Sequence, residues 1–98
     1  MTQNTPQPLN ESDMATLKKQ EKAWVQRLNK LLAACPSKRL AFATTGDCDV
    51  SIFNEPQYAA ICDEQENNGG EFIAAAARIR ALFDEVLSFP NQVESTAG

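Results

Sequence analysis

The three cysteines are the side chains of this sequence best suited to covalent chemistry or metal binding. Cys35, Cys48 and Cys62 are 13 and 14 residues apart, and no Cys-x-x-Cys pair occurs. The chain has no histidine, so the commonest general base and the commonest transition-metal ligand are both missing. Acidic neighbours disfavour a reactive thiolate at Cys48 and Cys62. We therefore interpret the cysteines as small buried thiols, and we expect no enzymatic activity, no metal site and no cofactor.

Carboxylates are the second group that could do chemistry. Asp47 and Asp49 flank Cys48, but a calcium loop needs a glycine where the sequence has Ile52. A spread of carboxylates can also imitate a phosphate backbone and occupy a basic groove on another protein. An acidic inhibitor that mimics nucleic acid is therefore one alternative function. Its carboxylates would be Asp47, Asp49, Glu55, Asp63, Glu64 and Glu66.

The charge is divided between the two halves of the chain. The net charge is −4 over 98 residues, yet residues 1–45 carry seven basic and three acidic side chains, whereas residues 46–98 carry two basic and ten acidic ones. Five of the basic residues are Lys18, Lys19, Lys22, Arg27 and Lys30. A positive helix face could neutralise phosphates, so a weak nucleic-acid-binding module is the second alternative. The acidic whole and the absence of interleaved stacking aromatics count against it.

Size and composition indicate a small folded protein. We expect a flexible arm over 1–8, a single α+β domain over 9–90 and a flexible tail over 91–98. No run approaches 18 apolar residues, and the polar beginning has no apolar core of a signal peptide. We therefore expect a cytoplasmic protein without membrane contact. A small bacterial or phage accessory protein would fit this description.

The strongest pattern is an apolar stripe in the first third of the chain, hereafter the stripe. Its steps of three and four residues place it on one side of a long helix, predicted over 11–34. Asn10 is a suitable N-cap for this helix and Pro36 would end it. A stripe of this length must be covered, either by the rest of the chain or by another chain. Its members are Met14, Leu17, Glu21, Trp24, Leu28, Leu31 and Cys35.

The remaining elements follow from local signals. Alternating apolar residues on either side of Thr45–Asp47 predict a β-hairpin. A helix is predicted to begin at Asn54–Pro56 and to end at Asn67–Gly70. A last helix is predicted from Glu71 to Phe89, with Phe72, Ala76, Ile79, Phe83 and Val86 on one side. The predicted fold is α+β and mostly helical: a long N-terminal helix, a central hairpin and a two-helix hairpin packed as one small domain.

These observations favour a small interaction or regulatory protein that acts by binding. The expected partner is another protein or a second copy of the chain, and homodimerisation through the stripe is the simplest form of this hypothesis. Binding energy usually concentrates at aromatic and arginine anchors. The predicted contact residues are therefore Glu21, Trp24 and Arg27, with Phe53 and Tyr58 as additional aromatic candidates.

Overall fold

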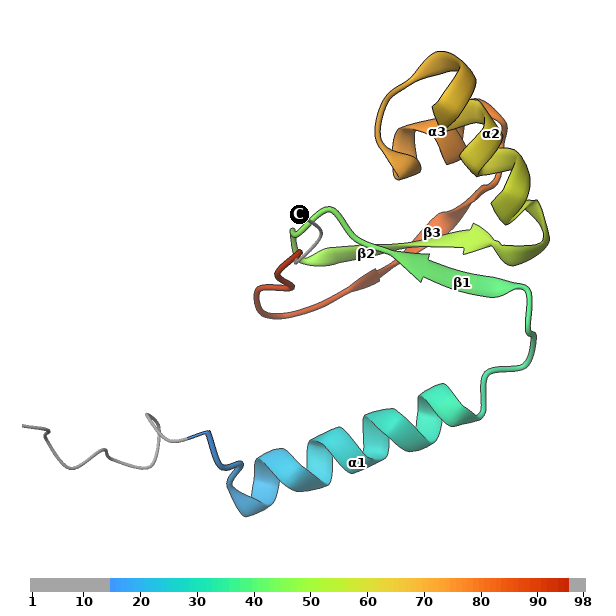
Figure 1. Ribbon diagram of the computed structural model, residues 1–98. Coiled ribbons are helices and arrows are strands. Elements are labelled where there is room, and N and C mark those ends of the chain that lie inside the picture. Colours follow the sequence, from blue (N-terminus) through green and yellow to red (C-terminus); the bar gives the residue numbers. More distant parts are fainter. Residues whose placement is uncertain (1–14, 96–98) are drawn as a thin grey trace, which may run out of the picture. The chain divides into compact units, whose positions relative to one another are not determined.

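A computed structural model describes residues 15–95 of the chain. The chain divides after Pro36 into two compact units, and each is described by itself (Figure 1). The first unit contains the helix α1 (Lys19–Ala33). The second contains a three-stranded antiparallel sheet and two further α-helices. This confirms the α+β class, whereas the prediction of one domain over 9–90 stays a prediction.

Helix α1 is shorter than predicted, because residues 15–18 are not helical. Lys18 is extended, and its N–H donates to Oε1 of Glu21 at 2.7 Å. Glu21 thus caps the helix from its third position and closes the first turn. At the other end, the last backbone bonds run from Ala34 and Cys35 back into the final turn. The end before Pro36 matches the prediction.

The predicted beginning of this helix at Asn10 and the predicted arm over 1–8 lie outside the described residues. Residues 96–98 of the predicted tail do so as well. The described part of that tail, 91–95, has no regular secondary structure. The Gln92 side chain nevertheless donates from Nε2 to the carbonyl oxygen of Gly46 at 2.6 Å, which ties this segment to the hairpin loop.

The predicted hairpin is present as β1 (Leu40–Ala43) and β2 (Asp49–Asn54). Side-chain bonds shape its loop, because the Thr44 hydroxyl accepts the N–H of Gly46 at 3.1 Å and Oδ1 of Asp47 accepts the N–H of Asp49 at 2.9 Å. Gly46 has φ +99, a conformation that glycine adopts readily. Strand β2 is the centre of the sheet, whose order is β1-β2-β3.

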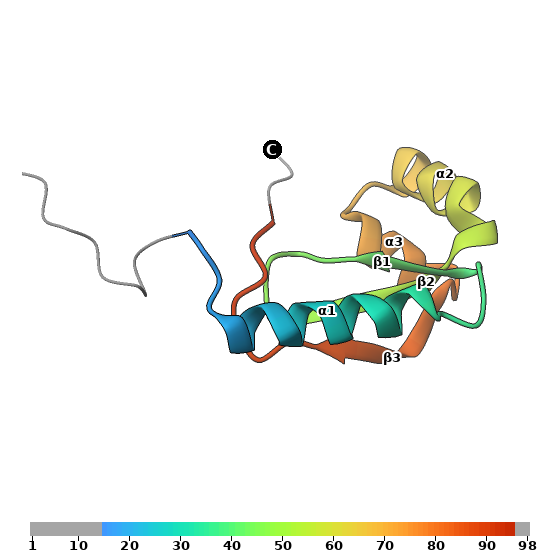
Figure 2. The same cartoon turned by 90° about the horizontal axis from the view of Figure 1, so that it is seen from below.

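A helical segment connects β2 to β3. It consists of the 3-10 turn η2 (Glu55–Gln57), α2 (Tyr58–Asn68) and α3 (Phe72–Arg78). Pro56 lies in the first turn, as predicted, and Gly69 and Gly70 end α2 at positive φ. Figures 1 and 2 show α2 and α3 together at the end of the sheet where β2 finishes and β3 begins.

The prediction of one helix from Glu71 to Phe89 is wrong beyond Arg78. Helix α3 ends there in a Schellman arrangement, in which the N–H of Ala81 donates to the Ala76 carbonyl at 2.8 Å and that of Arg80 to the Ala77 carbonyl at 3.1 Å. Arg80 takes φ 58, the left-handed conformation that closes such a cap. Glycine usually occupies this position, so an arginine there gave no warning that the helix ends.

Residues after the cap form β3 (Leu82–Ser88), which pairs with β2. The register joins Val50 to Leu87 and Ser51 to Val86, with an irregularity before Phe53 meets Leu82. These apolar residues have helical spacing, but they form a strand. A two-stranded hairpin alone is marginally stable, so a third strand paired with β2 stabilises the sheet. The sheet is therefore three-stranded rather than the predicted hairpin.

Both faces of the sheet carry apolar side chains. Because paired residues point to the same side, Ala41, Ala43 and Phe53 share one face, and these residues pack in or against the buried cluster. The opposite face, hereafter the open face, points away from that cluster. Register and alternation place on it Leu40, Phe42, Val50, Ile52 and Leu87.

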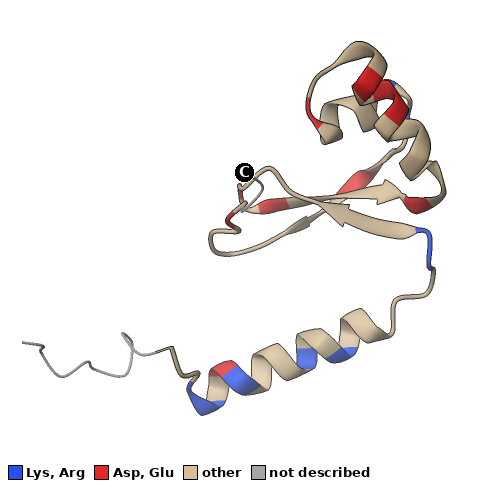
Figure 3. Ribbon diagram, viewed as in Figure 1, with Lys and Arg blue, Asp and Glu red and all other residues tan. Residues whose placement is uncertain are grey.

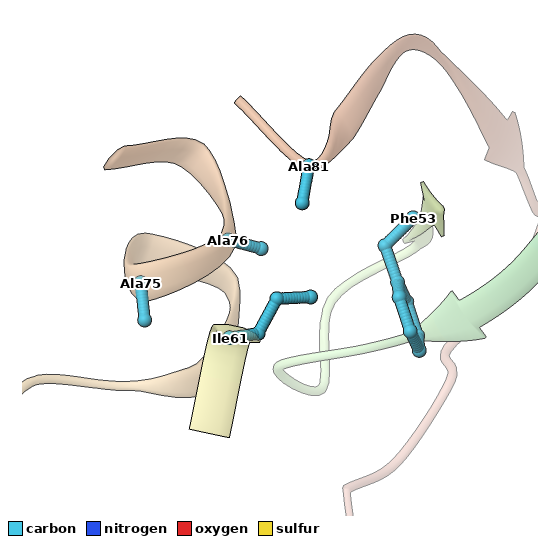
Figure 4. Packing of buried hydrophobic residues seen from close by; sticks show 5 residues of the cluster. All are labelled: Phe53, Ile61, Ala75, Ala76 and Ala81. Carbon is cyan, nitrogen blue, oxygen red and sulfur yellow. The ribbon is translucent and has the colours of Figure 1, made fainter. Parts of the chain in front are cut away.

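The buried core is small and lies between the sheet and the helices (Figure 4). Among the described residues it contains Phe53, Ile61, Ala75, Ala76 and Ala81, and Ile61 is the one large side chain with no exposure. Three alanines let α3 approach α2 and the start of β3 closely. Core volume therefore depends on a single aliphatic side chain and one aromatic ring. Within residues 15–95, no helix has the length and apolar character that crossing a membrane requires.

We expect Ile61→Ala to lower the free energy of unfolding by about 2–4 kcal/mol, because it leaves a cavity in a core with few other large side chains. Urea unfolding followed by circular dichroism measures this loss. Ile73→Ala is the matched control, since Ile73 is half-buried and outside the cluster, and it should cost less than half as much. Equal losses at the two positions would contradict the assigned core.

The left-handed conformation of Arg80 gives a second expectation. Arg80→Gly removes the steric cost of positive φ, whereas Arg80→Val places a β-branched side chain there. We expect the valine variant to be less stable than the glycine variant by about 1–2 kcal/mol. Urea unfolding of the two variants tests this, and indistinguishable stabilities would contradict a left-handed Arg80.

Candidate interaction surfaces

Helix α1 has no buried side chain. Its Trp24, Leu31 and Leu32 are exposed, and its other large apolar residues, Val25 and Leu28, are half-buried. Leu17 and Trp24 of the stripe are each 48% exposed, and Leu31 is 71% exposed. Leu32, beside the stripe, is 49% exposed. A single 15-residue helix cannot bury its own apolar side, and in isolation a helix of this length is marginal in water. The apolar stripe is therefore left uncovered within its own unit.

Three of the predicted contact residues lie on α1 at steps of three residues, which keeps them on neighbouring parts of one side. Trp24 and Arg27 are exposed there. Glu21 is exposed too, but its carboxylate already accepts the Lys18 N–H. A glutamate within an apolar stripe thus has a local role as the helix cap, which the sequence spacing did not reveal.

The two aromatic candidates lie in the second unit, in a cluster with Phe72. The ring centroids of Phe53 and Phe72 are 5.0 Å apart at 71°, an edge-to-face contact, and Tyr58 lies 5.8 Å from Phe72 and 6.4 Å from Phe53. Phe53 is only 6% exposed, so it is a core residue, and its role in a contact stays a prediction. Alternation showed that β2 has two faces but not which one is covered.

Tyr58 remains accessible at 51% exposure. A hydrogen bond with the Cys62 side chain, the nearby charge of that thiol and some desolvation raise the pKa of Tyr58 above its ordinary value. The phenol therefore stays neutral and keeps its hydroxyl proton at physiological pH. Tyr58 is exposed, and its role as a contact residue stays a prediction. The other predicted contact residue of its unit, Phe53, is buried.

Basic and acidic side chains are distributed unequally between the two units (Figure 3). Residues 15–36 carry five basic side chains and one acidic one, whereas residues 37–95 carry four basic and ten acidic ones. The described part of the first unit thus has a net charge of +4 and that of the second −6. Surfaces of opposite sign attract one another over about one Debye length.

An ion pair closes the turn between α2 and α3. Nε of Arg78 lies 2.6 Å from Oε2 of Glu64, and the other arm of the guanidinium donates to the Gly69 carbonyl at 2.7 Å. The side chain of Asn68 donates to Oε1 of Glu64 at 3.1 Å. The bonds from Arg78 and Asn68 hold the pKa of Glu64 below its ordinary value. Glu64, one of the carboxylates considered for nucleic-acid mimicry, therefore has a structural role in the helical hairpin.

The cysteines do not form a site. Cys35 and Cys48 are exposed and Cys62 is half-buried, so the prediction of buried thiols is wrong for the first two. Both lie next to chain turns, where a small apolar residue is not drawn into the core. Between Ala15 and Ser95, no three Cys, Asp or Glu side chains are grouped closely enough to hold a metal ion.

The open face is the surface that sequence reasoning missed. Its signal was present in the alternation of Leu40, Phe42, Val50 and Ile52, but alternation alone does not tell which side of a hairpin is covered. The structure instead uses their neighbours Ala41, Ala43 and Phe53 for the core. Arg39 lies over the Phe83 ring at 4.8 Å, which joins the beginnings of the two edge strands.

Comparison with known proteins adds no relative, because no family model, no curated protein and no solved structure matches this chain. The functional assignment therefore depends on the exposed apolar surfaces and on the charge distribution.

The lowered pKa of Glu64 predicts a pH-dependent contribution to stability. Because the pKa is lower in the folded than in the unfolded state, the carboxylate stabilises the fold above its unfolded value of about 4.3. This stabilisation is lost as the pH falls through the folded pKa. Unfolding free energies of the wild type and Glu64→Gln should therefore differ at neutral pH and converge in acid. Glu66→Gln is the control, and a constant difference across pH would contradict the ion pair.

Proposed function

We propose that the protein acts by binding another protein molecule, that α1 is its contact helix and that the bound molecule is a second copy of the same chain. The observation that supports this proposal is the exposure of Trp24 and Leu31 along one side of a helix that has no buried side chain, together with the exposure of Leu17 just before that helix. Exposed apolar surface of this extent commonly marks an interface.

Residue chemistry supports α1 as the source of binding energy. Tryptophan and arginine are the residue types most enriched at energetic centres of interfaces. Along the stripe Trp24 is followed by Leu28 and Leu31, so its indole ring has apolar neighbours toward the C-terminal end of the helix. Helices with this arrangement bind by placing their apolar side in a hydrophobic surface of the partner.

A second copy accounts for the charge distribution of the chain. Its acidic unit offers a surface of opposite sign to the basic unit that contains α1. Nucleic acid would engage the lysines of α1 but would leave the apolar stripe without a partner. It would also be repelled by the ten acidic side chains in residues 37–95. Association between copies satisfies both features at once.

The test is the mass of the full-length chain in solution, measured by sedimentation equilibrium over a range of concentrations. We expect a reversible dimer in the micromolar range. The combined substitutions Trp24→Ala and Leu28→Ala should weaken association at least about tenfold, because each truncates an apolar anchor. Gln20→Ala and Gln26→Ala together form the control, since they retain helix propensity outside the stripe.

Three results would contradict this proposal. One is a wild-type chain that stays monomeric at every concentration. Another is unfolding of the Trp24 and Leu28 variant as a monomer, which would identify the stripe as internal core. The third is association that requires added nucleic acid and falls steeply with salt, which would move the function to the lysines of α1.

A further inference from the structure

The open face of the sheet is an apolar surface that the second unit does not cover. Strand pairing places Phe42 opposite Ile52 and Val50 opposite Leu87 on this side. Their sequence neighbours Ala41, Ala43 and Phe53 pack on the other side, in or against the buried cluster. Because side chains alternate between the two sides of a strand, the open face is on the side of the sheet opposite to the cluster that α2 and α3 help to form.

This face does not have the composition of a solvated one. An antiparallel sheet with one face in water normally alternates apolar and polar side chains. Here the outward positions of β1 and β2 are leucine, phenylalanine, valine and isoleucine, with Asn54 at the end of β2 as the polar exception. Phe42 is 47% exposed, and Leu40, Val50 and Ile52 are half-buried. Large side chains are thus more numerous on the open face than among the fully buried residues, where Ile61 is the one large example.

We propose that the open face is the docking surface for the apolar stripe of α1 from a second copy of this chain. The inference rests on the proposed function, and it names the surface that α1 binds. Helix α1 has 15 residues and is about 22 Å long. Strands β2 and β3 have six and seven residues, or about 20–23 Å. One helix can therefore cover the sheet along its length, as helices cover sheets in layered folds.

A second copy fits this surface better than a helix of unrelated sequence. Each copy carries one apolar helix side and one open face, so two copies that exchange helices cover both pairs and close into a two-fold symmetric dimer. The helix carries Lys19, Lys22, Arg27 and Lys30, and it would lie over a unit with an excess of acidic side chains. The connection from Ala34 to Arg39 is short and contains Pro36, which favours an extended hinge at Cys35. Short constrained hinges favour exchange of elements between copies.

The geometry differs from direct pairing of two stripes. A coiled coil would bring α1 of one copy against α1 of the other, but 15 residues make only about two heptads. That pairing would also leave both open faces uncovered. Docking of a helix on a sheet instead places Trp24 and Leu28 against Phe42 and Ile52. Substitutions on the open face can therefore distinguish this docking from pairing of two stripes.

The test combines two variants of the full chain in sedimentation or light-scattering measurements. Phe42→Asp places a charge on the open face, and Trp24→Asp places one on the stripe. Each variant alone should lose association by at least about a hundredfold, because both of its helix-to-sheet contacts are damaged. In a mixture, the intact helix of the first variant meets the intact face of the second. Mixing should therefore restore a heterodimer with one undamaged contact.

Val86→Asp is the matched control for Phe42→Asp. Val86 is also 47% exposed and also lies in an edge strand, but its pairing with Ser51 places it on the other side of the sheet. It should leave association within about threefold of the wild type. Circular dichroism confirms that each variant is folded, and Phe42→Gln replaces Phe42→Asp if the aspartate variant is not.

The outcomes separate the inference from the proposed function. Loss of association in Trp24→Asp but not in Phe42→Asp or Phe42→Gln would leave the proposed function intact and overturn the open face as its docking surface. Loss in both single variants without recovery on mixing would also overturn the exchange of helices. A monomeric wild type whose stability falls with Phe42→Asp would assign the occupant to the same chain and overturn both. Recovery on mixing supports the inference, because stripe-to-stripe pairing cannot produce it.

Discussion

The main constraint on this structure is that the second unit, which begins at Ser37, buries little apolar surface within itself. Its core contains one phenylalanine, one isoleucine and three alanines between the sheet and the helices. A domain of about 60 residues is marginal even with an ordinary core. Five large apolar side chains on the open face lie outside this core. A molecule that covered the open face, as proposed, would supply burial that the unit lacks and would thereby stabilise it.

The first unit has the complementary requirement. Helix α1 has a local cap from Glu21 and a defined end before Pro36, but a helix of this length gains most of its stability from packing of an apolar side. Trp24, Leu28 and Leu31 provide such a side. The two units thus each present an apolar surface, one on a basic helix and one on a sheet within an acidic unit. In the proposed dimer, binding between copies would cover both surfaces and bring opposite charges together.

Several elements could be predicted from sequence because their signals are local. Alternation around Gly46 located the hairpin, Pro56 located the helix start and Gly69–Gly70 located its end. The region after Arg78 could not be predicted in this way. Phe72, Ala76, Ile79, Phe83 and Val86 have helical spacing, and what ends the helix is a left-handed arginine together with a strand partner at β2.

The candidate site was predictable in part for the same reason. Exposure of Trp24 follows from a helix without a covering layer, whereas alternation alone could not say that Phe53 is buried and Phe42 is exposed. That distinction depends on the side from which α2 and α3 approach, which is a property of the tertiary fold. Glu21 likewise has the spacing of an interface residue but the hydrogen bond of a helix cap.

The most direct measurement of the central claim is isotope-filtered NMR on an equimolar mixture of labelled and unlabelled full-length chain. Only contacts between copies produce signals in this experiment. We predict cross-peaks between the indole ring of Trp24 in one copy and the side chains of Phe42 and Ile52 in the other. Cross-peaks that connect Trp24 only to α1 residues of the other copy, or no cross-peaks between copies at concentrations where a dimer would form, would contradict the account.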